Sequence, residues 1–226
     1  MHLMTVFSHP FADRYPAAVM RAFHEPFRGP GHSIDVLDLD AEGFDPRFTP
    51  ADHDHFWGGP LPDGIGDMHR RVEAADRLAF VFPVYWWGMP ALMKGWIERV
   101  FTPGWAYQYG SGVEDRGKDA VAASLLPSIP TALIGIGGSK EATYDKYGYA
   151  DAMRTQLEVG TFAYCGLRDV ESHLIFDVEG DHNAGNRSAG LDQARRAGAA
   201  FASPERVARD AKEEHFETVP RRGQPC

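Results

Sequence analysis

The chain has 226 residues, 43% of them hydrophobic, and a net charge of −9. This size and apolar content suit one α/β domain spanning residues 1–226, in which we expect the highly charged segment 204–226 to be a flexible C-terminal tail. The acidic balance argues against binding to nucleic acid or to anionic membranes, and no apolar run reaches the roughly eighteen residues of a membrane span. With no signal-peptide pattern and only Cys165 and Cys226, we expect a cytoplasmic protein without a disulfide framework.

Strand patterns and helix patterns alternate along the chain. Strands are expected over residues 2–7, 33–39, 78–82, 131–136 and 170–176. Helices are expected over residues 15–23, 66–75, 90–101, 150–162 and 190–202. The segment 42–64 is rich in Gly, Pro, Asp and His and is expected to be a surface loop, and 103–130 is an excursion whose structure the pattern does not define.

Alternating strands and helices imply right-handed crossovers and a parallel sheet with helices on both faces. Five strands suit a flavodoxin-like three-layer sandwich with strand order 2-1-3-4-5, whose ligand binds at the carboxyl edge between the first and third strands. The glycine fingerprint of dinucleotide-binding Rossmann folds, G-x-G-x-x-G, does not follow the first strand, which disfavours that fold.

The most unusual segment lies where the third strand ends, at Tyr85-Trp86-Trp87-Gly88. Pro90 follows, and proline suits the first turn of a helix. That helix has an apolar stripe of its own, spaced by three and four: Leu92, Met93, Trp96, Ile97 and Val100. Because the strand and the helix already have their core residues, the aromatic turn is available to hold a planar apolar ligand, with core packing as the alternative.

Residues 82–101, FPVYWWGMPALMKGWIERVF, resemble the signature of the flavodoxin-like NAD(P)H:quinone oxidoreductases, and residues 102–109, TPGWAYQY, continue the match. This family includes the DT-diaphorase type, bacterial drug-activity modulators and ancillary subunits of glutathione-gated potassium efflux systems. The resemblance implies a homodimeric flavoprotein that binds FAD, or alternatively FMN. It also implies hydride transfer from NAD(P)H through flavin N5 to a quinone or similar planar acceptor, with ping-pong kinetics.

The same resemblance assigns the site residues. Cofactor contacts fall on the turn after the first strand, the aromatic turn, and the Gly-Gly turn with the loop after it: His9, Arg14, Tyr15, Pro83, Val84, Tyr85, Trp86, Trp87, Gly88, Ile136, Gly137, Gly138 and Tyr144. The pocket for donor and acceptor is lined by Trp86, Trp87, Tyr107, Tyr109, Tyr149 and Tyr164. The catalytic contacts are Trp86, Tyr107, Tyr109 and Tyr144, of which Tyr107 and Tyr109 reach over the flavin of the other subunit.

Three departures from the family pattern leave alternatives open. Arg14 and Tyr15 stand where Ser and Phe are usual, so Arg14 could bind the diphosphate by charge instead. Gly135 and Ile136 replace two threonines, so only backbone contacts carry over there. The loop that holds Tyr144 lacks the family's histidine, and a phenol, a water or a ribityl hydroxyl would have to move the proton.

Other interpretations fit parts of the pattern. The chain could serve mainly as an ancillary subunit that docks on a cation transporter, or as an electron carrier like flavodoxin. The Tyr-x-Tyr lid disfavours a carrier, which needs its flavin edge exposed. His53 and His55 lack further ligands at zinc spacing, so no metal site is expected. Cys165 is expected to be a small buried thiol.

Overall fold

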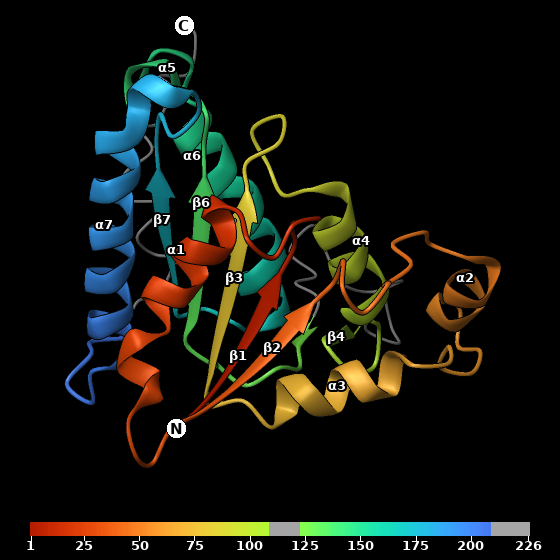
Figure 1. Ribbon diagram of the computed structural model, residues 1–226. Coiled ribbons are helices and arrows are strands. Elements are labelled where there is room, and N and C mark those ends of the chain that lie inside the picture. The colour runs from red at the N-terminus through yellow and green to blue at the C-terminus, as the bar shows by residue number, and fades with distance from the viewer. Residues whose placement is uncertain (109–122, 209–226) are drawn as a thin grey trace, which may run out of the picture.

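The computed structural model describes residues 1–108 and 123–208, and its centre is a five-stranded parallel sheet (Figure 1). The strands are β1 (His2–Phe7), β2 (Ser33–Asp38), β3 (Arg77–Pro83), β6 (Thr131–Ile136) and β7 (Val170–Ile175). Their order is β2-β1-β3-β6-β7, and each neighbouring pair is parallel. Since β4 and β5 lie outside this sheet, the order is the predicted 2-1-3-4-5, and the flavodoxin-like fold class is confirmed.

Helices cover both faces of the sheet and complete three layers (Figure 1). One face is covered by α1 (Tyr15–Phe23), the short 3-10 helix η1 (Glu25–Arg28) and α7 (Ala184–Ala202). The other face is covered by α3 (Ile65–Glu73), α4 (Ala91–Val100), α6 (Tyr149–Arg154) and the π-helix η3 (Thr155–Phe162). The remaining described elements are α2 (Pro50–Phe56), α5 (Glu141–Tyr147), the 3-10 turns η4 (Ala163–Cys165) and η5 (Asp181–Asn183), and β4 (Tyr107–Gln108), which pairs antiparallel with β5 (Ala123–Ser124).

The central strand β3 contributes to both layers of the core. Successive side chains of a strand point to opposite faces. Leu78, Phe80 and Phe82 belong to the core under α3 and α4, whereas Ala79 and Val81 belong to the core under α1 and α7. Because both of its faces are buried, the strand is apolar from Leu78 to Pro83 instead of alternating between apolar and polar residues.

A close backbone contact joins α1 to α7. A Cβ atom built on Gly198 would lie 2.1 Å from the carbonyl oxygen of Phe23. Glycine therefore lets the two helices approach, and the rings of Phe23 and Phe201 pack with centroids 5.7 Å apart. Gly185 of the same helix has no atom within 4 Å of a built Cβ, so it makes no such contact.

Gly198→Ala should destabilise the protein, whereas Gly185→Ala should not. Overpacking against a rigid backbone costs roughly 1–3 kcal/mol, while alanine in an open helical position is favoured over glycine by up to about 1 kcal/mol. Urea denaturation of the two variants, followed by circular dichroism, measures the difference. Equal midpoints would show that α1 and α7 tolerate a side chain where they cross.

Several predicted boundaries were wrong. The predicted loop 42–64 contains α2, which begins with a capping box: the Asp52 N–H donates to the Thr49 hydroxyl (3.4 Å), and the Thr49 N–H donates to the Asp52 carboxylate (2.7 Å). The predicted loop around Tyr144 is helix α5, and the predicted helix 150–162 is α6 continued by η3. The final helix begins at Ala184 instead of residue 190, and the segment 103–130 contributes β4 and β5.

The described residues also bear on the expectations from composition. Cys165 is buried, and burial raises the pKa of its thiol to about 12, so the expectation of a buried thiol is confirmed. Cys226 and most of the segment 204–226 lie outside the described residues, and the single-domain assignment stays a prediction.

Within residues 1–108 and 123–208, no helix has the length and hydropathy that crossing a membrane requires. The same residues contain no group of three or more His, Cys, Asp or Glu side chains placed to hold a metal ion.

Candidate functional site

The carboxyl ends of the parallel strands meet at one edge of the sheet, toward which the arrows in Figure 1 point. The Val84 N–H donates to the Ile136 carbonyl (2.8 Å), and the Gly137 N–H donates to the Ile175 carbonyl (2.7 Å). These bonds continue the strand pairing one residue past β3 and β6. The aromatic turn after β3 therefore lies beside the Gly-Gly turn after β6.

Trp86 and Trp87 are the two central residues of a tight turn. Tyr85 and Gly88 exchange two backbone hydrogen bonds of 3.1 Å each, as in a two-residue hairpin. Between them, Trp86 and Trp87 have φ angles of 50° and 62°. Positive φ at both central residues defines a type I′ turn, which normally contains Asn, Asp or Gly because larger side chains are strained there.

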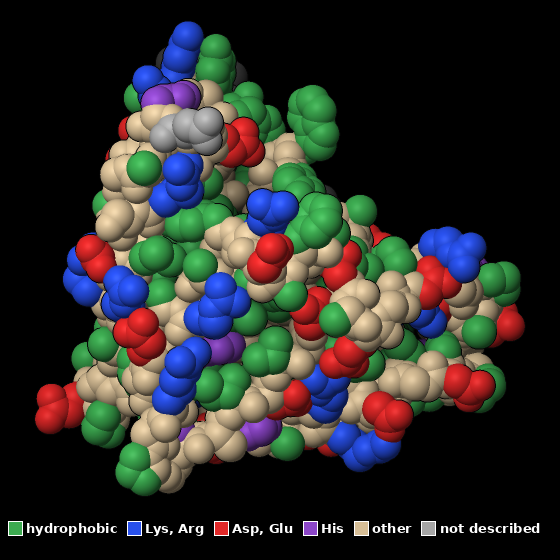
Figure 2. Space-filling view, viewed as in Figure 1, with side chains coloured by type: hydrophobic (Ala, Val, Ile, Leu, Met, Phe, Trp, Pro, Cys, Tyr) green, Lys and Arg blue, Asp and Glu red, His purple; other side chains and the backbone are tan. Residues whose placement is uncertain are grey.

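Packing does not compensate for this strain at Trp86, whose side chain is 95% exposed. Figure 2 shows a hydrophobic side chain projecting from the surface above the loop that follows β3 in Figure 1. Among the described residues no packing buries Trp86, which argues against the core-packing interpretation of the aromatic turn at this residue. Strained residues tend to gather at ligand sites, so the turn is a candidate binding element.

Trp87, in contrast, is half-buried in an aromatic group from α5 and α6. Its ring stacks on Tyr149 with centroids 3.8 Å apart and meets Tyr144 edge-on at 5.3 Å. The ring centroids of Tyr147 and Tyr149 are 5.4 Å apart. Between these two residues Gly148, with a φ of 69°, ends α5 before α6 begins. These contacts hold the turn against the helices and leave Trp86 at its tip.

Gly137 and Gly138 are positions where a side chain would displace a neighbouring side chain. A Cβ on Gly137 would lie 2.6 Å from the Tyr144 hydroxyl, and one on Gly138 would lie 2.4 Å from the Glu179 carboxyl carbon. Tyr144 is only 1% exposed, and burial raises its pKa, so its hydroxyl stays protonated and can donate a hydrogen bond. The Gly-Gly backbone therefore packs against Tyr144 and Glu179, with Gly137 buried and Gly138 partly exposed beside the aromatic turn.

Three predicted cofactor contacts, His9, Arg14 and Tyr15, lie in the turn after β1 and at the start of α1. The Phe11 N–H donates to the His9 Nδ1 atom (3.1 Å), which fixes the orientation of the imidazole ring in this turn. Tyr15 donates its hydroxyl proton to the Arg187 carbonyl (2.8 Å), and burial raises its pKa to about 12. Its hydroxyl therefore joins α1 to α7 within the chain. Arg14 is exposed at the start of α1, with its guanidinium 5.7 Å from the centre of the Phe11 ring and its Nε 3.6 Å from the Asp13 carboxylate.

Tyr107 and Tyr164 lie elsewhere, in a cavity of about 400 Å³ between α2 and α4. Their ring centroids are 5.7 Å apart. We call this cavity the α2–α4 pocket. Its aromatic lining consists of Phe48, Phe56, Phe101, Tyr107 and Tyr164.

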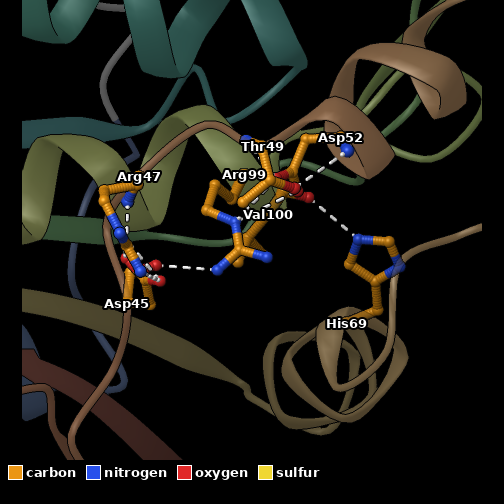
Figure 3. Close-up of polar contacts among 7 residues, drawn as sticks. All are labelled: Asp45, Arg47, Thr49, Asp52, His69, Arg99 and Val100. Atoms are coloured by element: carbon orange, nitrogen blue, oxygen red, sulfur yellow. Dashed lines mark hydrogen bonds and ion pairs between the residues drawn. The ribbon is translucent and has the colours of Figure 1, made fainter.

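A buried ion pair connects α2 to α4 at this pocket (Figure 3). The Arg99 Nε donates to both carboxylate oxygens of Asp52 at 3.0 and 3.1 Å, and the two side chains are 12% and 3% exposed. Burial acts to raise the pKa of Asp52, but hydrogen bonds from Thr49 and Arg99 outweigh it, and the net effect lowers that pKa. The pair therefore stays charged at neutral pH and fixes the wall of the pocket.

The predicted pocket residues thus divide between two places in one chain. Trp86, Trp87 and Tyr149 lie at the carboxyl edge of the sheet, whereas Tyr107 and Tyr164 line the α2–α4 pocket. Figure 1 shows the turn after β3 and strand β4 at opposite ends of α4. The remaining predicted pocket residue, Tyr109, lies outside the described residues.

The sequence analysis missed three residues that lie at the aromatic turn or the α2–α4 pocket: Asp52, Arg99 and Tyr147. The spacing from Thr49 to Asp52 is a readable signature of a helix start. Tyr147 flanks Gly148 in a way that is typical of a helix break with an aromatic pair. Arg99 lies within the family-like run, but its spacing carries no signal that it lines a cavity.

Comparison with known proteins agrees with this architecture. A family model described as "Flavodoxin-like fold" matches residues 1–197. The chain is 30% identical over 195 residues to NAD(P)H dehydrogenase (quinone) 1 of Cavia porcellus, which covers 77% of this chain and 68% of that protein. The chain belongs to the flavodoxin-like NAD(P)H:quinone oxidoreductase family.

Other members of the family match over most of their length. An uncharacterized NAD(P)H oxidoreductase of Haemophilus influenzae is 26% identical over 179 residues, with 79% of this chain and 85% of that protein covered. The solved structure of the NAD(P)H:quinone oxidoreductase from Methanothermobacter marburgensis is 27% identical, with a TM-score of 0.79 over 90% of this chain and 98% of that chain. The likeness therefore extends well beyond the aromatic run.

Trp86→Asn should not lower stability, whereas Trp87→Asn should. Asparagine tolerates positive φ and would relieve a strain of roughly 1–3 kcal/mol at Trp86, where no packing is lost. At Trp87 the same relief is opposed by the loss of stacking on Tyr149. Thermal unfolding of both variants, diluted so that chains do not associate, gives the comparison. A lower melting temperature for Trp86→Asn than for Trp87→Asn would mean that the Trp86 ring packs within its own chain.

Proposed function

We propose that the protein is a flavin-dependent NAD(P)H:quinone oxidoreductase. The observation that carries the proposal is the strained, exposed Trp86 beside the Gly137-Gly138 turn. It offers a flat aromatic surface at the sheet edge where flavodoxin-like folds bind their ligands. The relatives described above are named as dehydrogenases or oxidoreductases, which favours an enzyme over the ancillary-subunit alternative.

The proposed cofactor is FAD, with FMN as the alternative. The backbone of Gly137 and Gly138 would lie against its ring, and His9 and Arg14 would face its phosphates. When bound, a flavin supplies hydride transfer at N5, from NAD(P)H and then to the acceptor, which use one pocket in turn. Tyr144 would hold a protonated hydroxyl beside Gly137, at the edge of the ring.

We further propose a homodimer in which each site uses two chains. Within one chain, the ten residues of α4 separate Trp86 from Tyr107, and a helix of that length spans about 15 Å. A second copy related by a two-fold axis could set its α2–α4 pocket, with Tyr107 and Tyr164, opposite Trp86. This arrangement would cover the exposed tryptophan and the open pocket in one interface.

The purified protein should bind a flavin stoichiometrically, and chromatography of the released cofactor distinguishes FAD from FMN. Trp86→Ala should reduce quinone-dependent NAD(P)H oxidation on the order of a hundredfold, because a misplaced donor ring loses the advantage of orientation. The melting temperature of the dissociated chain should change little, because the ring is exposed within one chain. Trp57→Ala, which removes another exposed tryptophan, is the matched control and should keep its turnover. Protein that shows neither visible flavin absorption nor quenching of added FAD or FMN would refute the proposal.

Light scattering at micromolar concentration should give the mass of a dimer. Dilution below the dissociation constant should abolish turnover while the circular dichroism of the chain is unchanged, because each fold survives and each site is divided. A monomer that keeps full quinone reductase activity would contradict the two-chain site.

A further inference from the structure

The α2–α4 pocket combines aromatic walls with a charged donor. Its volume of about 400 Å³ lies within the range of small-molecule sites. Aromatic walls fit a flat apolar ring and leave the oxygen atoms of such a ring to the polar part of the lining. The charged side chains of that part are Asp52, Glu98 and Arg99. Carboxylates accept hydrogen bonds, so Arg99 is the charged donor of the lining.

Arg99 keeps donors that its protein contacts do not use. A guanidinium group has five N–H donors. Its Nε donates to Asp52, and its Nη1 donates to the Asp45 carbonyl (2.7 Å). No hydrogen bond from Nη2 is found among the described residues, and Figure 3 draws one terminal nitrogen of Arg99 without a dashed line. Because Arg99 lines the pocket, Nη2 is the nitrogen of its guanidinium that remains for a ligand there.

The unused donors are held in a fixed position. Asp52, which holds Arg99, also accepts from the Thr49 N–H (2.7 Å) and the Thr49 hydroxyl (2.6 Å). The Arg99 guanidinium lies 5.5 Å from the centre of the Phe44 ring. A side chain held in this way loses little further freedom when a ligand binds, so its hydrogen bond contributes fully to affinity.

We propose that Arg99 donates a hydrogen bond from Nη2 to a carbonyl oxygen of the acceptor and thereby selects quinones. This inference rests on the proposed quinone reduction. A quinone offers carbonyl oxygens as acceptors and has no donor of its own. It gains a hydride from NAD(P)H and a proton from water, so negative charge develops on oxygen before protonation. The guanidinium stays protonated throughout and stabilises that charge.

Equilibrium dialysis of duroquinone and durene in the absence of NAD(P)H tests this inference without turnover. The two ligands share a tetramethylated ring, and only duroquinone has carbonyl oxygens. Wild-type protein should bind duroquinone roughly tenfold or more tightly, because a hydrogen bond from a charged donor is strong. An apolar cavity without a usable donor would instead prefer durene, the more apolar ligand.

Three variants locate the donor. Arg99→Lys should lose the preference for duroquinone, since lysine keeps a charge beside Asp52 but lacks the planar fork. Arg71→Lys is the matched control, because Arg71 is likewise a largely buried arginine held by acidic side chains, those of Asp35 and Glu42, and does not line the pocket. Thr161→Trp places a large side chain in the lining and should weaken the binding of both ligands.

Equal affinities of wild-type protein for the two ligands would overturn the inference, as would a preference for duroquinone that survives in folded Arg99→Lys. If Arg99→Lys does not fold, the wild-type comparison and Thr161→Trp decide, and undiminished binding to Thr161→Trp would overturn the assignment. Flavin content and NAD(P)H oxidation are measured on the same preparation. If both are present without the ligand preference, only the role of Arg99 fails; if both are absent, the proposed function fails.

Discussion

The candidate site depends on the two backbone hydrogen bonds that join Tyr85 to Gly88. They close a turn with only two central residues, and they force Trp86 and Trp87 into positive φ. The same geometry separates the two rings. Trp87 is directed into the aromatic group with Tyr149, whereas Trp86 stands in solvent. A longer loop would remove the strain, but it would also remove the defined position of the exposed ring.

Helix α4 determines how the rest of the site is arranged. It begins just after the turn and ends shortly before Tyr107, so it acts as a rigid spacer between the exposed tryptophan and the α2–α4 pocket. Its last turn also carries Arg99, which ties α2 to the pocket wall through Asp52. Helix α4 thereby fixes both the distance between Trp86 and the α2–α4 pocket and the shape of that pocket. This is the physical reason to consider two chains for each proposed site.

The sheet could be predicted from sequence because buried parallel strands form continuous apolar runs and end at clear turns, as in residues 78–83 of β3. Helix α2 was missed because the density of Pro, Gly, Asp and His in 42–64 outweighed its capping box. Helix α5 was missed because the residues around Tyr144 were interpreted through a family loop. These errors concern short elements, in which local signals compete.

The candidate site was predicted in part. The residue types that mark the aromatic turn and the Gly-Gly turn were readable, because unusual aromatics and paired glycines stand at strand ends. The positive φ of Trp86 was not readable, since nothing in a tryptophan predicts a conformation that disfavours it. The separation of Tyr107 and Tyr164 from Trp86 was equally hidden, because it arises from the packing of α4 and α2.

The central claim is that each site is built from two chains, and complementation of two damaged variants tests it most directly. Trp86→Ala and Tyr107→Ala would be unfolded and refolded together, so that mixed dimers form. In a mixed dimer one site carries both substitutions and the other carries neither. Random pairing then predicts that the sample recovers roughly a quarter of wild-type quinone turnover. Turnover no higher than the mean of the two separate variants would contradict the account, because each site would then be complete within one chain.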